Sequence, residues 1–239
     1  ISKDNYGGVP FMGKKEAVIV GSGTSLLNSG LGRRIDSFHT VFRFRRGEEN
    51  LIKHCHDTGV KTDTLVSNCN WHTCRILLRL LKKGHMDEIG ASRLAFSSTR
   101  NNSHKSKQWR SVWEYTKKHN IPTDIFRTRE GTNALLNGLS ITTGDIKIPK
   151  TYTAGFNTLC CLLNCNYKFH EVHFEHYEFD KIYLCGFDYL TPNPSMRNFY
   201  LPNQKIGCRH GYRTWHNLKG ESVLIRRIID KTDKIEVLN

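Results

Sequence analysis

The sequence of 239 residues has no long apolar run, no low-complexity tract and no repeat of fixed period. A membrane-spanning helix needs about 20 consecutive apolar residues, so we expect none in this chain. Eight cysteines are too few for a disulfide scaffold. None of them forms a Cys-x-x-Cys pair, which disfavours a zinc ribbon or a thioredoxin-like site. These absences exclude a fibre, a membrane span and a disulfide-stapled miniprotein.

The composition is that of a folded globular protein, with 38% hydrophobic and 24% charged residues. The length suits one substantial domain over residues 1–239, with an N-terminal extension over 1–14. Lys and Arg number 36 against 22 Asp and Glu, which gives a formal charge of +14. We therefore expect an anionic partner: a nucleic acid, a nucleotide-activated donor, an acidic glycan or an anionic membrane surface.

Predicted strands and helices alternate along the chain. A β-branched run predicts a buried strand at 16–20, and a short helix is expected from Ser25 to Leu31. Further strands are predicted at 39–44, 64–67, 93–97, 121–126 and 181–185, and helices at 73–83, 107–119, 153–167 and 217–231. The Pro-, Asn- and Gly-rich segment 187–214 predicts a long loop.

This alternation predicts a Rossmann-like α/β fold, with a mainly parallel central sheet flanked by helices on both faces. Such folds bind ligands beyond the carboxyl ends of their strands. The turn Gly21-Ser22-Gly23-Thr24-Ser25 follows the first predicted strand. Glycines let the backbone approach a ligand, and free amides at a helix start favour phosphate. The turn lacks the third glycine of a dinucleotide fingerprint and the lysine of a P-loop, so a plain strand-to-helix connection fits it equally well.

Two other groups occupy predicted strand ends. Arg43 and Arg45 lie two residues apart and so share one face of a strand, where they can meet an anion or pair with surface acids. Gly186, Phe187 and Asp188 follow the strand at 181–185. They belong either to a site or to an ordinary strand end at which Asp188 starts a turn.

Taken in order, these segments resemble the motifs of the eukaryotic-type sialyltransferases. The similarity extends over about half of the chain, and it is the set of motifs rather than any single one that makes it specific. The large motif matches residues 18–44 and 58–62; the small motif matches Thr153-Ala154-Gly155 and 182–187; the third motif matches His210 and Tyr212; and the very short motif matches His216 and Glu221.

The resemblance implies a single catalytic domain that transfers sialic acid from CMP-sialic acid to a glycan hydroxyl with inversion. The partners are then a CMP-activated sugar and a glycan acceptor, with no metal and no other cofactor. A sugar hydroxyl is a poor nucleophile, so a base of near-neutral pKa must take its proton, and His216 is the candidate. His210 and Tyr212 would stabilise the departing cytidine phosphate. The sequence has no Asp-x-Asp triplet, which disfavours a metal-bridged diphosphate donor.

The resemblance also implies which residues line the nucleotide site, and all of them lie at predicted strand ends or at one helix start. They are Gly21, Ser22, Gly23, Thr24, Ser25, Arg43, Arg45, Ser67, Asn68, Thr153, Ala154, Gly155, Gly186, Phe187 and Asp188. Glu221 is expected to orient the site or to cap the last helix. The segment 187–214 is expected to be an active-site loop that sets the acceptor.

Three positions depart from the family pattern. Ala17 replaces the cysteine that opens the large motif, so the usual disulfide to the small motif is not expected. Ser22 and Arg45 replace two asparagines that touch the nucleotide, and Arg45 adds a charge that suits a phosphate or a carboxylate. The family precedent places the protein in the Golgi lumen if it is anchored upstream. Without an anchor, the unpaired thiols favour the cytoplasm.

Two alternatives to the transferase stay open from the sequence. A nucleotide-fold protein could act on or bind nucleic acid, with Trp109, Trp113 and Tyr115 as a stacking patch, although these rings also fit the buried face of a helix. A catalytically inactive relative could serve as a binding module. The His- and Glu-rich stretch at 170–178 lacks the His-Glu-x-x-His spacing, so no metal site is assigned there.

Overall fold

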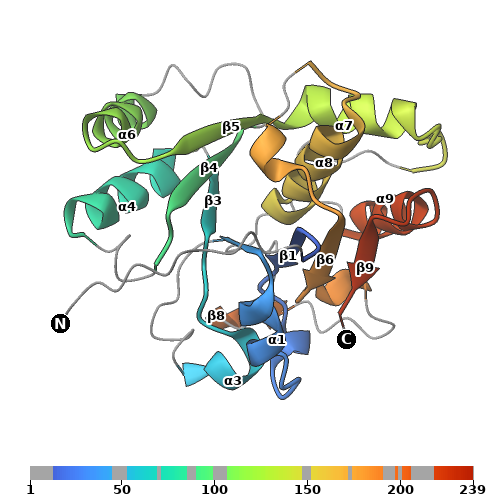
Figure 1. The fold of residues 1–239 in the computed structure, drawn as a ribbon, viewed down its shortest axis with the longest axis horizontal. Coiled ribbons are helices and arrows are strands. Elements are labelled where there is room, and N and C mark those ends of the chain that lie inside the picture. Colours follow the sequence, from blue (N-terminus) through green and yellow to red (C-terminus); the bar gives the residue numbers. More distant parts are fainter. Residues whose placement is uncertain are drawn as a thin grey trace.

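A parallel sheet lies at the centre of the molecule (Figure 1). The computed structural model describes residues 13–44, 53–68, 71–84, 90–98, 107–146, 152–171, 174–190, 197–198, 201–205 and 218–238. Within them, seven strands follow the order β5-β4-β3-β2-β1-β6-β9, and every neighbouring pair is parallel. The strands are β1 (Glu16–Val20), β2 (Thr40–Phe44), β3 (Thr64–Asn68), β4 (Arg93–Ser98), β5 (Thr123–Arg127), β6 (Lys181–Cys185) and β9 (Ile235–Val237). The predicted α/β class is confirmed.

Helices cover both faces of the sheet because the strand side chains alternate between two apolar layers. Ala17 and Ile19 of β1 belong to the layer that also contains buried residues of α7, α8 and α9. Val18 and Val20 point to the opposite face, where α1 packs with α3, and where α4 and α6 pack on β3 and β4. The helices are α1 (Gly32–Ser37), α3 (Cys55–Thr58), α4 (Trp71–Lys82), α6 (Lys107–Lys118), α7 (Thr128–Gly138), α8 (Ala154–Tyr167) and α9 (Leu218–Ile229).

The helix predicted from Ser25 to Leu31 is wrong. A single 3-10 turn, η1 (Thr24–Leu26), follows β1, and α1 begins only at Gly32. Asn28 and Gly30 between them have φ angles of 65° and 66°, in the left-handed region. Their amides donate to the carboxylate of Asp57 at 2.9 and 3.0 Å. These two contacts take the backbone out of helical hydrogen bonding.

The other predicted helices and strands are found with ends shifted by at most two residues. The sequence did not predict α3, α7 or β9. In α7 only a few apolar residues, such as Leu135 and Leu136, break a polar run, and β9 is only 3 residues long. The predicted loop at 187–214 contains a 3-10 turn, η4 (Asp188–Leu190), and an antiparallel pair, β7 (Arg197–Asn198) and β8 (Leu201–Lys205). The rest of that segment lies outside the described residues.

Four of the described cysteines, Cys74, Cys160, Cys165 and Cys185, are buried in the apolar core. In the described part of the chain all six are free, and Ala17 is fully buried in the same apolar layer as Cys160. Burial raises the pKa of Cys160 and of Cys185 to about 12, so both remain protonated thiols at neutral pH. No helix among the described residues has the length and apolar character that a bilayer crossing requires.

Candidate active site

The strand order reverses at β1, which lies between β2 and β6. From β1 the chain builds outward through β2, β3, β4 and β5, and α7 and α8 then return it to β6 on the other side of β1. In open α/β sheets the crevice outside the carboxyl ends of the strands at such a reversal is the usual ligand site. Here it lies where residues 21–25 leave β1 and residues 186–188 leave β6.

The glycines at this edge allow two strand ends to approach each other closely. The amides of Gly21 and Gly23 donate to the carbonyl oxygens of Cys185 and Gly186, both at 2.8 Å. A Cβ atom on Gly21 would lie 2.3 Å from the oxygen of Gly186, which itself has a φ of 68°. The close backbone contact that these glycines permit is therefore with the neighbouring turn.

Asp188 closes the turn after β1. Its carboxylate accepts hydrogen bonds from the amides of Thr24 and Ser25, at 2.8 and 3.0 Å, and from the Thr24 hydroxyl at 3.1 Å. The residue is 1% exposed. Four amides of the turn therefore have partners within the protein, whereas the amide and hydroxyl of Ser22 have none among the described residues. Sequence reasoning gave no sign of this contact, since it joins residues 164 positions apart.

The start of α8 meets the same edge. Thr153 caps the helix, because its hydroxyl oxygen accepts the amide hydrogen of Phe156 at 3.2 Å. The ring of Phe187 lies against Gly155, where a Cβ atom would come within 2.6 Å of its Cε1 atom. The predicted group at 153–155 thus lies against the group at 186–188.

Glu221 fastens α9 to the start of α8. Its two carboxylate oxygens accept hydrogen bonds from the amide and the hydroxyl of Thr153, each at 2.7 Å. The side chain is fully buried, and burial raises the pKa of Glu221 to about 7, although the Thr153 hydrogen bonds oppose this rise. Glu221 is expected from the sequence to orient the site or to cap the last helix. In the structure its carboxylate binds Thr153, the N-cap residue of α8.

Arg43 holds the chain that leads into β3. Its guanidinium is buried on the α1 face, where Nε donates to Lys61 O at 2.8 Å and Nη2 donates to Thr58 O at 2.6 Å. Neither partner is an acidic side chain. Nη1 has no partner among the described residues. Arg43 therefore has a structural role at the end of β2, next to Val20 in the strand register.

Two of the other predicted site residues lie within the described part of the chain, and four lie outside it. Ser67 is buried at the carboxyl end of β3, and Asn68 is the last residue of that strand, two strands away from β1. Arg45, His210, Tyr212 and His216 lie outside the described residues. Their assigned roles stay predictions.

The aromatic patch considered for nucleic acid is the inner face of α6. Trp109 is 4% exposed, and its ring meets Phe96 edge to face with 4.5 Å between centroids. The Tyr115 hydroxyl donates to Leu81 O at 3.0 Å, and Trp113 stacks on Trp109 beneath the Lys117 ammonium. These rings fill the space between α4, α6 and the sheet and offer no open stacking platform.

Two side chains of the His- and Glu-rich stretch have polar partners within the protein. His176 Nε2 lies 3.2 Å from the carboxylate of Asp124, and Glu178 lies 3.4 Å from the ammonium of Lys168. Among the described residues no three His, Cys, Asp or Glu side chains are grouped as metal ligands.

Comparisons with known proteins point to one class of enzyme. The sequence model of glycosyltransferase family 29 (sialyltransferase) matches residues 12–123, which reach from β1 to the start of β5. A comparison with curated proteins finds no match.

Solved sialyltransferase structures share the fold. The monofunctional α-2,3-sialyltransferase Cst-I from Campylobacter jejuni is 15% identical, with 94% of this chain and 76% of that chain covered and a TM-score of 0.52. CstII from Campylobacter jejuni, in complex with the substrate analogue cytidine-5′-monophosphate, is 15% identical over 93% and 78%, with a TM-score of 0.51. A mammalian sialyltransferase is 12% identical over 94% and 69%, also with a TM-score of 0.51.

The chain thus has the α/β fold of sialyltransferases. The sequence pattern of glycosyltransferase family 29 occupies its N-terminal half. The family match supports the predicted enzyme class, a glycosyltransferase of the sialyltransferase type.

Proposed function

We propose that this protein is a eukaryotic-type sialyltransferase that moves sialic acid from a CMP-activated donor to a glycan hydroxyl. One observation carries the proposal: residues 21–25, 153–155 and 186–188 converge at the carboxyl ends of β1 and β6. These segments belong to the large and small motifs, and ligands of such sheets bind at this edge.

Three backbone amides and one hydroxyl near the edge are available to bind the donor phosphate. Ser22 presents its amide and hydroxyl, and the amides of Ala154 and Gly155 have no partner among the described residues. The latter two open α8, a helix of 14 residues with no acidic side chain in its first turn. Because the helix dipole favours an anion at this end, we assign the phosphate to the space between Ser22 and α8.

The acceptor chemistry is assigned to the segment that leads into α9. His216 precedes Leu218, the first residue of α9, and Glu221 in the first turn fastens this helix to Thr153. We infer that His216 takes the proton of the acceptor hydroxyl as the hydroxyl oxygen bonds to the anomeric carbon and the bond to CMP breaks. His210 and Tyr212 donate to the departing phosphate, Arg45 meets a phosphate or a carboxylate of the donor, and Glu221 acts as a positioning residue.

The test combines a transfer assay with a binding titration. The chain is incubated with CMP-sialic acid and a panel of glycans, and CMP release and the product mass are followed. We expect His216→Ala to lower kcat by about a thousandfold, as loss of a general base does, while CMP binds as before. His119→Ala removes an exposed histidine at the end of α6 and serves as the matched control. A wild-type chain that binds neither CMP nor CMP-sialic acid contradicts the proposal.

A further inference from the structure

More than half of the net charge is concentrated in one part of the chain. Residues 71–120 contain eleven Lys and Arg against three Asp and Glu, a net charge of +8 out of +14. This part forms α4, β4 and α6, which lie together at one side of the sheet, away from β1 and β6 (Figure 1). The cations of α4 and α6 therefore lie at a distance from the candidate active site.

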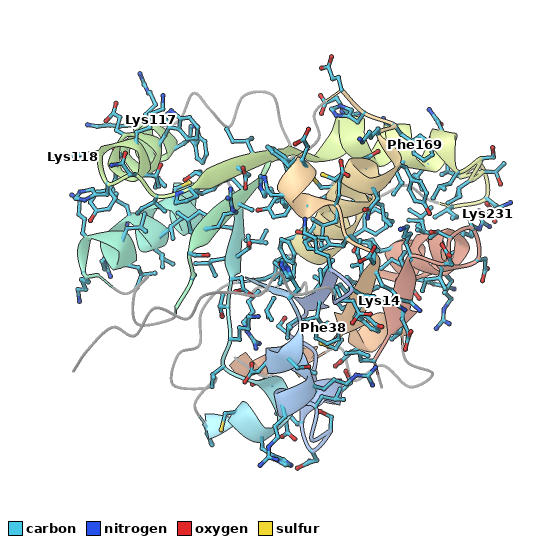
Figure 2. All side chains as sticks on the ribbon, in the orientation of Figure 1. Lys14, Phe38, Lys117, Lys118, Phe169 and Lys231 are labelled. Carbon is cyan, nitrogen blue, oxygen red and sulfur yellow. The ribbon has the colours of Figure 1, made fainter. Side chains whose placement is uncertain are left out.

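Most of these cations lie on the exposed sides of α4 and α6 and on the turn after α4. Leu77, Leu81, Trp109 and Val112 point inward and are buried against β3 and β4. Figure 2 shows Lys117 and Lys118 at the outer end of α6, on the side away from the sheet. We define the basic face as the exposed residues of the two helices and of the turn after α4: Arg75, Ile76, Arg79, Lys82, Lys83, Lys107, Arg110, Glu114, Lys117 and Lys118.

Six cations of the basic face lack an acidic partner among the described residues. Arg79, Lys82, Lys83, Lys107, Arg110 and Lys118 form no ion pair with any residue that the structure describes. On the rest of the surface, Arg227 pairs with Asp145 at 2.6 Å and Lys181 pairs with Glu236 at 2.9 Å. Unpaired cations side by side repel one another, and an external anionic surface would relieve this repulsion.

We propose that the basic face binds an anionic lipid surface. The two 12-residue helices pack against each other, and each is about 18 Å long, which presents cations over an area rather than along a line. Ile76 is 41% exposed among them and adds an apolar contact at the bilayer interface. Nucleic acid is less suited to this face because the Trp109 and Tyr115 rings that could stack on bases are turned inward.

The test is sedimentation of the full chain with vesicles of phosphatidylcholine alone or mixed with phosphatidylserine. Binding is expected only to the mixed vesicles and is expected to fall as salt is added, because exposed charges are screened beyond about 10 Å at 0.1 M salt. The variant Arg79→Glu/Lys83→Glu/Lys118→Glu should weaken binding at least about tenfold, since each basic residue near the surface adds to the attraction.

A matched variant separates location from net charge. Lys14→Glu/Lys53→Glu/Lys231→Glu changes the charge equally at exposed positions outside the basic face, and should weaken binding by no more than about threefold. Equal losses in both variants, or no binding to mixed vesicles, overturn the proposal. So does tighter binding of a single-stranded oligonucleotide through the same three residues. If the glutamate variant does not fold, the corresponding glutamine variant tests the same point.

Discussion

Charged side chains are buried and hydrogen-bonded at the β1–β6 edge, whereas they are exposed on the basic face. At the edge, two acidic side chains are buried with partners: Asp188 accepts the Thr24 and Ser25 amides, and Glu221 accepts from Thr153. On α4 and α6, Arg79, Arg110 and Lys118 are exposed and form no ion pair with any described residue. A buried charge needs such partners because water no longer solvates it, whereas an exposed one does not.

The cations of the basic face and the candidate site are therefore separate features of this chain. The buried charges at the edge hold β1, β6, α8 and α9 together, and their removal should unfold or distort that edge. The exposed charges on α4 and α6 should be removable with little effect on folding.

Asp188→Ala should lower the free energy of unfolding by about 4 kcal/mol, because it leaves the buried amides of Thr24 and Ser25 without acceptors. Urea unfolding measures the loss. Asp180→Ala is the control, since Asp180 also accepts a backbone amide, that of Lys15 at 2.6 Å, but is exposed. There we expect about 1 kcal/mol or less. Equal losses in the two variants would show that Asp188 does not hold the edge.

Glu221 should make stability depend on pH. Burial raises the pKa of Glu221 from 4.5 to about 7, so the folded protein keeps a proton that the unfolded chain releases in this window. Stability therefore falls as pH rises from 4.5 to 7 and levels off above it. One pKa unit corresponds to about 1.4 kcal/mol, so the loss should reach about 3 kcal/mol.

Comparison with Glu221→Gln isolates this effect, because the amide cannot ionise. As the pH is raised from 4.5 to 7, the wild type should lose stability relative to the variant. Urea titrations of both proteins at matched pH values measure this loss. Glu114→Gln, at an exposed carboxylate on the basic face, should show no such difference. A wild-type curve parallel to that of Glu221→Gln would rule out the raised pKa.

Gly155→Ala should cost about 2 kcal/mol, because the new methyl group would lie 2.6 Å from the ring of Phe187. The double variant Gly155→Ala/Phe187→Leu should recover part of the loss, which thermal unfolding can follow. Gly144→Ala is the matched control, since a Cβ atom there meets nothing within 4 Å. If Phe187→Leu instead lowers the free energy of unfolding by as much in the double variant as it does alone, Phe187 does not limit the space at position 155.

Arg79→Gln should change the free energy of unfolding by no more than about 0.5 kcal/mol, because the exposed side chain forms no hydrogen bond or ion pair with any described residue. Arg227→Gln should cost about 1 kcal/mol, since Arg227 makes two hydrogen bonds to Asp145 and another to Thr142 O. Chemical unfolding at low salt compares the two. A larger loss at Arg79 than at Arg227 would reverse the contrast.

The strands and most helices could be predicted because their signals are local. The β-branched run of β1 and the apolar stripes of α4 and α9 lie within a dozen residues each. The helix predicted at 25–31 failed because Asp57, about 30 residues further on, takes the amides that a helix would use. No local pattern reports such a distant acceptor.

The candidate site was predictable to a similar extent. The motifs identified the segments around Gly21, Thr153 and Gly186, which the structure brings to one edge of the sheet. The contacts that fix them join Thr24 to Asp188 across 164 positions and Thr153 to Glu221 across 68 positions. Those pairings follow from the fold, so the sequence could indicate the residues but not their partners.

The central claim is that CMP binds between Ser22 and the start of α8. Hydrogen–deuterium exchange, measured by peptide with and without CMP, tests it most directly, because the amides of Ser22, Ala154 and Gly155 have no partner among the described residues. Our account predicts slower exchange in peptides that contain 21–25 and 153–157, and unchanged exchange across α6. Protection confined to α4 and α6, or no protection at saturating CMP, would contradict it.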